Sequence, residues 1–219
     1  MEPFGNDNPV PLFAVLNCKI LNIIPIGENK HIRIEFSCGK SFFEAVYFNM
    51  EADKFEFNKY DFADIACNIN INDFNREKVQ YIIRDIRLNE KYARDCLEEK
   101  ENYYKFIKND FNMKLNKNDI PVKEDFKSVY IFLLNSFKKD VLYSQAYNIN
   151  KMQIRFYESS KIIMPRFKFR IILDIFNEMG IIYAEHDFDN INKIKINNQS
   201  GKINLDNSEI YIKLKSLDF

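Results

Sequence analysis

Residues 65–73 read IACNININD, and this stretch decides how the first part of the chain folds. Its apolar and polar residues alternate with a period of two, the spacing that places neighbouring side chains on opposite faces of a β-strand. One face carries Ile65, Cys67, Ile69 and Ile71, and the other carries Ala66, Asn68, Asn70 and Asn72. The pattern predicts a strand with one buried face, in a sheet that covers a core.

The same alternation continues on both sides of this stretch. It predicts strands at about residues 12–25, 31–37, 41–49, 62–72 and 78–88, joined by turns in which Gly or Asn can take positive φ. A short polar segment after the third strand can form one helical turn. Five strands, a long first strand and this insert favour a five-stranded OB-fold β-barrel. An SH3-like barrel or a plain meander is the alternative.

From residue 89 onward the apolar period becomes helical, so the whole chain is predicted to be of the mixed α+β class. Residues 89–111 contain no Gly or Pro and predict one stiff amphipathic helix that links the two halves of the chain. Its apolar stripe is predicted to consist of Ala93, Leu97, Lys100, Tyr104, Ile107 and Phe111.

The remaining residues predict three further helices and a hairpin. Asp119 can cap a helix over residues 126–137, a less regular helix is expected near 149–158, and a third runs from Pro165 to Gly180 with a core stripe. That stripe is Phe169, Ile172, Phe176 and Met179. Two strands within 181–205 and a last helix over 207–217 follow. The predicted domains are an OB-fold domain (1–88), a linker helix (89–118) and a winged-helix-like domain (119–219), with a generic helical domain carrying a hairpin as the alternative.

Composition argues against catalysis by this chain. The 32 basic and 32 acidic residues balance, and the two histidines, His31 and His186, lie far apart in the sequence. No nucleophile elbow, phosphate loop or dinucleotide-binding turn is present. We therefore expect no catalytic residue, metal site or cofactor here. The cysteines are expected to be small buried apolar residues in a reducing cytosol, and no apolar run approaches the roughly 20 residues of a membrane span.

The predicted barrel offers one candidate binding face. Strands two and three of OB-folds commonly bind single-stranded nucleic acid through aromatic and cationic side chains. Arg33 is predicted to point outward, and the third strand has more aromatic residues than a one-sided core can hold. The exposed rings would suit stacking or, equally, docking of a neighbouring domain. The candidate residues are Lys30, Arg33, Phe42, Tyr47 and Lys78.

The second half holds a cluster of basic residues interleaved with Phe and Tyr. Residues 1–88 contain 10 Lys and Arg against 13 Asp and Glu, so the basic surplus lies after residue 88. Such a cluster can bind a phosphate backbone or an acidic protein tail, and a merely solvated helix face is the alternative. Its members are Arg155, Lys161, Arg166, Lys168, Arg170, Lys193 and Lys195.

The first residues carry a family resemblance. The stretch EPFGNDNPVPLF at residues 2–13 resembles the junction motif that precedes the OB domain of the RecJ family of single-strand-specific exonucleases, and RDIR at residues 84–87 resembles the motif that ends that domain. Asp7 departs from the glycine common in the family, which concerns one local turn. IPVKEDFKSVY and FRIILDIFNEMGII resemble the extra C-terminal domain of RecJ proteins from low-G+C Gram-positive bacteria.

The resemblance implies a C-terminal fragment of a longer bacterial, cytoplasmic nuclease that acts in DNA repair and recombination. The family's catalytic motifs match no position of this sequence, so its Mn²⁺ or Mg²⁺ chemistry is expected in a core outside these residues. The implied partners are single-stranded DNA, the nuclease core of the same polypeptide and the acidic tail of single-strand-binding protein, with no membrane. An alternative is a structural module that braces the core and has little DNA affinity of its own.

Overall fold

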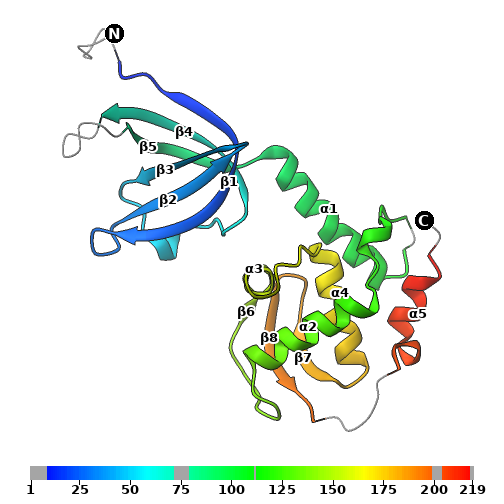
Figure 1. The fold of residues 1–219 in the computed structure, drawn as a ribbon. Coiled ribbons are helices and arrows are strands. Elements are labelled where there is room, and N and C mark those ends of the chain that lie inside the picture. Colours follow the sequence, from blue (N-terminus) through cyan, green and yellow to red (C-terminus); the bar gives the residue numbers. More distant parts are fainter. Residues whose placement is uncertain (1–8, 72–78, 111, 199–203, 218–219) are drawn as a thin grey trace. The chain divides into compact units, whose positions relative to one another are not determined.

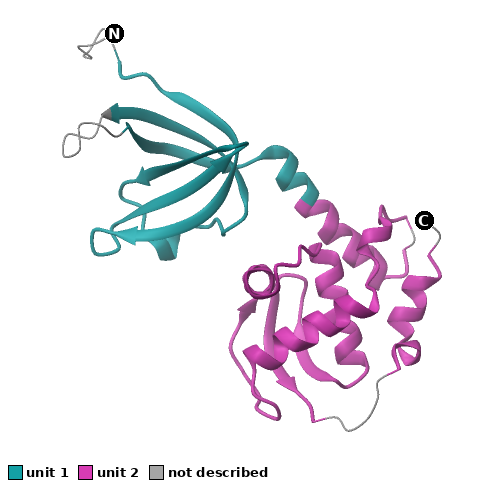
Figure 2. Cartoon of the chain, viewed as in Figure 1, with its two compact units in different colours: residues 1–95 teal, residues 96–219 magenta. Residues whose placement is uncertain are grey.

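The computed structural model describes residues 9–71, 79–110, 112–198 and 204–217. The chain forms two compact units, residues 1–95 and residues 96–219 (Figure 2). Helix α1, Glu90–Ile107, runs from the first unit into the second. The predicted mixed α+β class is confirmed.

Unit 1 is a closed five-stranded barrel (Figure 1), which confirms the predicted OB-fold. The strand order is β1-β2-β3-β5-β4, and β3 pairs with β5 in parallel while the other pairs are antiparallel. A 3-10 turn, η1 (Ala52–Lys54), follows the third strand, as predicted. The strands are β1 (Phe13–Ile26), β2 (His31–Cys38), β3 (Ser41–Tyr47), β4 (Phe62–Ile71) and β5 (Val79–Leu88).

Alternating side chains fill the barrel. On β2, Ile32, Ile34 and Phe36 are fully buried while the residues between them face outward, which confirms the predicted alternation. On β4, Ile65 and Cys67 are buried as predicted. The apolar core of unit 1 therefore consists mainly of one face of each strand, as expected when one face of a sheet is buried.

The alternation on β4 fails beyond Cys67. Ile69 is exposed and Asn68 is buried, contrary to the prediction. The β4–β5 register shifts between Ala66 and Cys67, and the Asn68 amide donates a hydrogen bond to the carbonyl oxygen of Pro11 at 2.8 Å. This bond offsets the cost of burying the amide. Nothing is described of the side chain of Ile71 or of Asn72.

A buried carboxylate joins three segments of unit 1. Asp64 Oδ1 accepts hydrogen bonds from the backbone N–H of Asn17 at 2.9 Å and from the Asn89 amide at 3.0 Å. Asn17 has φ of 56° and lies where the β1–β4 register shifts. The Asn17 N–H, the Asn89 amide and the nearby Arg87 lower the pKa of Asp64, since each favours the charged carboxylate. The bulge in β1 is thereby fixed to β4 and to the start of α1.

Unit 2 places five helices around a small sheet of order β6-β8-β7 (Figure 1). After α1 the chain forms, in order, a helix, a strand, two helices and two strands, and then a last helix. The elements are η2 (Lys117–Asp119), α2 (Lys123–Ser136), β6 (Tyr147–Asn148), α3 (Ile149–Ser160), α4 (Arg166–Glu178), β7 (Ile182–His186), β8 (Asn190–Ile196), η3 (Leu205–Asn207) and α5 (Glu209–Lys215).

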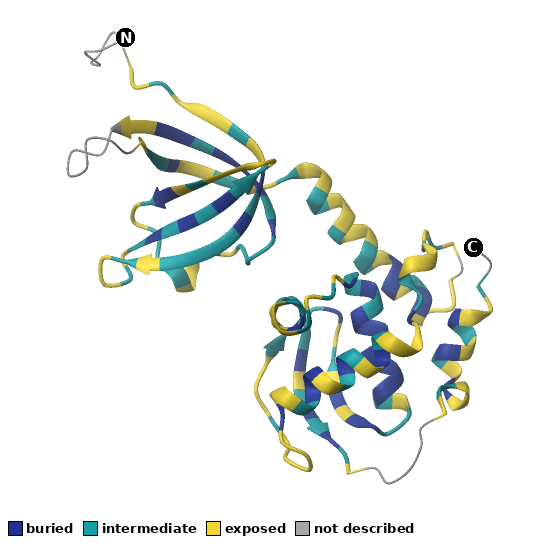
Figure 3. Ribbon diagram, in the orientation of Figure 1, coloured by how far each residue is buried: buried dark blue, intermediate teal, exposed yellow. Residues whose placement is uncertain are grey.

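Helix α4 is the central element of unit 2. Three residues of its predicted stripe, Phe169, Ile172 and Phe176, are buried, and the fourth, Met179, is half-buried at the C-cap. Residues on the other faces, including Ile171 and Ile175, are buried as well (Figure 3). It contacts α2, α3, α5 and β7. A helix that is buried on nearly every face is a core helix, so α4 has little free face left for a ligand.

The predicted stripe of α1 is wrong in part. Leu97, Tyr104 and Ile107 are exposed, whereas Tyr103 and Phe106 are buried in the core of unit 2. The helix ends at Ile107, and Phe111 lies outside the described residues. Counting in steps of three and four selects more than one face of a helix with this many apolar residues, and the sequence does not say which face the second unit covers.

The start of α2 also differs from the prediction. Asp119 lies in η2, where its carboxylate accepts from the backbone N–H of Asn116 at 2.7 Å, so it does not cap α2. Val122 is the N-cap residue, and the Asp125 carboxylate accepts from its N–H at 2.9 Å. An acidic residue in the first turn is favoured there by the helix dipole.

Candidate nucleic-acid interface

Two of the residues predicted on the barrel face lie in ion pairs. Arg33 points outward from β2, as predicted, and its Nη1 lies 3.6 Å from Glu44 Oε2. Lys30, in the β1–β2 turn, has its Nζ 3.3 Å from Glu28 Oε2. These pairs are solvated, so they contribute little to stability, but each cation is offset by an adjacent carboxylate.

The predicted aromatic residues of β3 separate into two environments. Phe42 is 75% exposed, whereas Tyr47 packs against the barrel core and is not an outer stacking platform. The exposed ring at that end of β3 is Phe48, which makes an edge contact with His31 at 5.2 Å between centroids. Lys78 lies outside the described residues.

The register of β1, β2 and β3 arranges their outer side chains in rows across the strands. In one row Glu35 on β2 lies directly opposite Glu44 on β3. We call this pair the acidic row. The next row away contains Arg33, paired with Ile24 and Val46. The outer face therefore presents two adjacent carboxylates with a single guanidinium beside them, which repels a phosphate backbone that follows the strands.

A second row crosses four strands and has a different character. Phe42 on β3 lies opposite Ser37 on β2, Ser37 opposite Lys19 on β1, and Lys19 opposite Phe62 on β4. The Lys19 ammonium lies 4.9 Å from the ring centroid of Tyr60 and 5.9 Å from that of Phe62. The Phe62 ring lies 5.6 Å from the Tyr92 ring. We call Phe42, Lys19, Phe62, Tyr60 and Tyr92 the aromatic row.

The turn before β4 fixes the position of Tyr60. This residue has φ of 70°, and its N–H donates to the Ile20 carbonyl oxygen at 2.7 Å, while the Ile20 N–H donates to the Asp61 carbonyl oxygen at 2.9 Å. The Tyr92 hydroxyl donates to the Asp61 carboxylate at 2.7 Å. Holding a tyrosine in the left-handed region costs of order 1–3 kcal/mol, and such strain is common at functional sites.

The aromatic row has the chemistry of a base-stacking surface. Phe42 leaves most of its ring in solvent, and the other rings and Lys19 are half-buried, which limits their movement. An aromatic face can stack on a base, and a nearby ammonium can contact a phosphate. Sequence reasoning found only Phe42 of this set. The others come from segments far apart in the chain, and no local pattern marks them.

The basic cluster predicted in the second half does not assemble into one cationic surface. Arg170, predicted to bind a nucleic acid or partner, is fully buried, which corrects that prediction. Lys168 Nζ lies 3.1 Å from Asp125 Oδ2, and this pair is largely buried. Lys193 pairs with Glu185 at 3.0 Å and Lys195 with Asp140 at 3.8 Å. Arg155 and Lys161 are exposed, and Arg166 is half-buried at the start of α4.

Arg170 belongs to a buried polar cluster. Its Nη2 donates to Asp174 Oδ1 at 2.9 Å and to the Tyr103 hydroxyl at 3.1 Å, and it contacts His186 Nδ1. Burial raises the pKa of Asp174 to about 6, against the opposing effect of Arg170. Burial, with the charge of Arg170, lowers the pKa of His186 to about 4. Removing a charge from water favours the neutral form of both groups.

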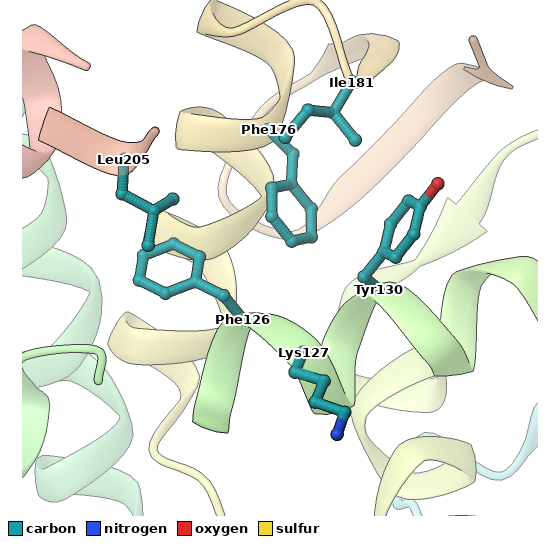
Figure 4. A pocket seen from close by; sticks show the side chains of 6 residues that line it. All are labelled: Phe126, Lys127, Tyr130, Phe176, Ile181 and Leu205. Carbon is teal, nitrogen blue, oxygen red and sulfur yellow. The ribbon is translucent and has the colours of Figure 1, made fainter. Parts of the chain in front are cut away.

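Unit 2 also carries a mostly apolar pocket of about 260 Å³. Figure 4 shows the rings of Phe126, Phe176 and Tyr130 around it, with the Lys127 ammonium directed away from Phe176. Ile181 and Leu205 complete its lining. The pocket can hold an apolar side chain, and its polar atoms do not converge on one point.

The described residues contain no group of three or more His, Cys, Asp or Glu placed to hold a metal ion. Across the same part of the chain, no helix is both long enough and apolar enough to span a bilayer. All four cysteines are free; Cys18 and Cys67 are buried, and Cys38 and Cys96 are half-buried.

The closed five-stranded barrel places unit 1 in the class of OB-fold domains. Residues 1–85 match the family model described as "RecJ OB domain". This match supports a RecJ-type OB domain in unit 1, and it covers the junction motif and the RDIR motif up to Asp85.

Two solved structures resemble parts of the chain. The second OB-fold domain of replication protein A from Methanococcus maripaludis is 14% identical, with a TM-score of 0.30, over 37% of this chain and 87% of that one. Asparaginyl-tRNA synthetase from Pyrococcus horikoshii is 7% identical, with a TM-score of 0.29, over 63% of this chain and 35% of that one. None of the curated proteins compared with the chain matches it.

Proposed function

We propose that unit 1 binds single-stranded DNA across the aromatic row, as the OB domain of a RecJ-like single-stranded-DNA-specific exonuclease. The observation that carries this proposal is the row itself, in which Phe42, Lys19 and Phe62 align across four strands. OB-folds bind single strands through aromatic side chains and cations on their outer face. The match to the RecJ OB domain supports the same class of ligand.

The charges on the barrel favour one direction for the DNA. A DNA strand that ran parallel to β2 and β3 would pass over the acidic row, Glu35 and Glu44. A DNA strand that crossed the β-strands along the aromatic row would contact Lys19 and avoid both carboxylates. Since phosphates are repelled by carboxylates at short range, we propose the second path.

The chain as a whole is proposed to be the non-catalytic C-terminal part of that nuclease, acting in DNA repair and recombination in the bacterial cytoplasm. The metal-dependent 5′ to 3′ cleavage, with Mn²⁺ or Mg²⁺, belongs in this proposal to a catalytic core of the same polypeptide. The role of unit 1 is to hold and guide the single strand toward that core.

A winged-helix role for unit 2 receives mixed support. The order helix, strand, helix, helix, strand, strand is that expected of a winged helix. The third helix in that order is α4, which is buried on nearly every face and cannot enter a DNA groove. Any contact of unit 2 with the acidic tail of single-strand-binding protein is therefore proposed at the exposed Arg155 and Lys161 rather than on α4.

Fluorescence anisotropy of a labelled oligothymidylate at low salt tests the proposed interface. Base stacking on one aromatic side chain is worth roughly 1–3 kcal/mol, so Phe42→Ala is expected to weaken binding by about 5-fold to 150-fold. Lys19→Gln is expected to weaken it less. The matched control is Phe48→Ala, because Phe48 is an exposed ring outside the aromatic row. Equal losses for Phe42→Ala and Phe48→Ala, or none for Phe42→Ala, would contradict the assignment.

The alternative function is a structural module that braces the nuclease core. The excess of acidic over basic residues in 1–88 and the acidic row favour it, because they weaken the electrostatic attraction on which most DNA binding depends. It predicts no binding of the oligonucleotide by this chain at tens of micromolar, and restored or tighter binding when the chain is joined to the core.

A further inference from the structure

We infer that Cys18 and Cys38 form a redox-responsive dithiol in the barrel, able to close into a disulfide that links β1 to β2. The inference concerns covalent chemistry of the barrel and does not depend on DNA binding. It rests on the register of the two strands, on the hydrogen bonds of the two thiols and on their different exposure.

The strand register brings the two residues together. β1 and β2 lie side by side (Figure 1), and Lys19 pairs with Ser37 and Ile20 with Phe36. The pairing ends at Lys19 and Ser37, and one further step in the same register would place Cys18 opposite Cys38. Directly opposed residues of antiparallel strands have Cα atoms about 4.5–5.5 Å apart, within the range that a disulfide spans.

Both thiols point to the same place. Cys38 Sγ lies 3.4 Å and Cys18 Sγ 3.8 Å from the carbonyl oxygen of Leu16. Burial, together with the nearby Cys38 side chain, raises the pKa of Cys18 to about 12, since both favour the protonated thiol. The two sulfurs thus approach one carbonyl oxygen from neighbouring strands, which places them on the same side of the β1–β2 pair.

Competing pairings are less favourable. Cys67 is buried in the same core, but its partner on β1 is Phe13, and Cys18 faces Ala63 on β4. Cys96 belongs to unit 2. The thiol that faces Cys18 across a strand pair is therefore that of Cys38.

The two cysteines differ in exposure, which sets the order of the steps. Cys18 is fully buried and Cys38 is half-buried at the end of β2, so an oxidant meets Cys38 first. With hydrogen peroxide, the Cys38 thiolate attacks one oxygen, an S–O bond forms as the O–O bond breaks, and the released hydroxide leaves as water after taking up the proton lost by Cys38.

The second step uses the buried thiol. The Cys18 sulfur attacks the sulfur of the Cys38 sulfenic acid, so that an S–S bond forms and the S–O bond breaks. The departing hydroxide takes the Cys18 proton as water. Two thiols have then lost two electrons, and one peroxide has been reduced to two waters.

Mass spectrometry of the full chain tests this inference. The reduced protein is exposed to hydrogen peroxide, denatured, alkylated with iodoacetamide and digested. We expect two of the four thiols to escape alkylation, one peptide pair joined between Cys18 and Cys38, and full recovery after reduction with dithiothreitol. Oxidised protein should also unfold at a higher temperature than reduced protein, because the crosslink restricts the unfolded chain.

Two variants separate this pairing from general oxidation. Cys18→Ser should leave a Cys38 sulfenic acid that dimedone traps, and Cys38→Ser should leave Cys18 alkylatable after denaturation. Four alkylatable thiols in the peroxide-treated wild type would overturn the inference. So would crosslinks found only between molecules, or a joined pair that contains Cys67 or Cys96 in place of Cys18 or Cys38.

Discussion

The buried cluster of unit 2 predicts that replacing His186 by glutamine changes how stability depends on pH. His186 and Asp174 lie on β7 and α4, with Arg170 and the Tyr103 hydroxyl facing them. Glutamine keeps a hydrogen-bond acceptor for Arg170 but carries no titrating proton. Any difference in pH dependence between the two proteins therefore reports the proton of His186.

The size of the effect follows from the pKa of His186. Its pKa is lowered from the ordinary 6.5 to about 4 by burial and by the charge of Arg170. Below pH 6.5 the unfolded chain takes up a proton that the native state does not, so stability falls as the pH falls toward 4. Between pH 7 and pH 5 this linkage costs the wild type about 2 kcal/mol.

Asp174 acts in the opposite direction over the same interval. Burial raises its pKa from 3.8 to about 6, so the native state takes up a proton before the unfolded chain does. Its contribution to stability is complete below about pH 4 and is lost as the pH rises through 6. Going from pH 7 to pH 5 it adds about 1 kcal/mol, which partly hides the loss caused by His186.

The expected result is a relative gain for His186→Gln on acidification. The stability of the variant minus that of the wild type should increase by about 2 kcal/mol between pH 7 and pH 5, whatever the constant cost of the substitution. Urea unfolding followed by NMR signals of the α4 residues 171–175 measures unit 2 separately from the barrel. Titration of the His186 ring by NMR gives its pKa directly, since the chain has only two histidines.

A raised or unchanged pKa of His186 in the folded protein would refute the predicted pH dependence. His186 Nε2 lies 3.1 Å from Asp174 Oδ1. If the imidazole is protonated and paired with this carboxylate, its pKa is raised, and His186→Gln loses stability relative to the wild type as the pH falls. A difference that is the same at both pH values would show that His186 has the same pKa in the folded and unfolded states.

Two further pairs of substitutions test unit 2. Arg170→Met leaves the Asp174 carboxylate buried without its partner and should lower the unfolding free energy by about 3–5 kcal/mol. The control Lys193→Met, at a solvated ion pair, should leave the unfolding free energy nearly unchanged. Thermal unfolding at neutral pH compares the two variants, and equal effects would contradict the buried pairing. Lys161→Gly should raise the unfolding free energy by about 0.5–1 kcal/mol in urea, because Lys161 ends α3 with φ of 61°, a conformation that glycine adopts without strain. The opposite change, Gly180→Ala at φ of 68°, should lower the unfolding free energy. A loss of stability with Lys161→Gly would contradict the assigned backbone strain.

The barrel was predictable because its apolar core is formed mainly by one face of each strand. A period of two in the sequence then predicts which side chains point into the barrel and which point to solvent, as the buried Ile32, Ile34 and Phe36 illustrate. Helix α1 was less predictable, because its buried face includes a polar residue. Asn102 is buried, with its amide donating to the Lys114 carbonyl oxygen at 3.0 Å and accepting from the Lys114 N–H at 3.2 Å. A sequence pattern places Asn on the solvent face of a helix, because it does not reveal the backbone groups that can pair with a buried amide.

The basic cluster shows a different limit of sequence reasoning. Counting charges identified seven cations but not their partners. Lys168 meets Asp125, which is 43 positions away, so no local pattern could reveal that pair. Arg170 and Asp174 are four residues apart on one helix, and this spacing was available as a signal of pairing. The buried apolar residues around Arg170 then make the pair part of the core.

The aromatic row could not be read from the sequence, because it exists only through the register of four strands. Phe42, Lys19 and Phe62 of this row belong to three strands. A shift of one residue in the register of a strand would direct its side chain into the barrel instead. The row also has a consequence for salt dependence. It contains one cation, and neutralising one phosphate gives a slope of only about −0.7 in log affinity against log salt for single-stranded DNA. The DNA binding proposed at this row would therefore depend mainly on stacking, and a tenfold rise in salt should weaken it only about 5-fold, at the lower end of the loss expected for Phe42→Ala.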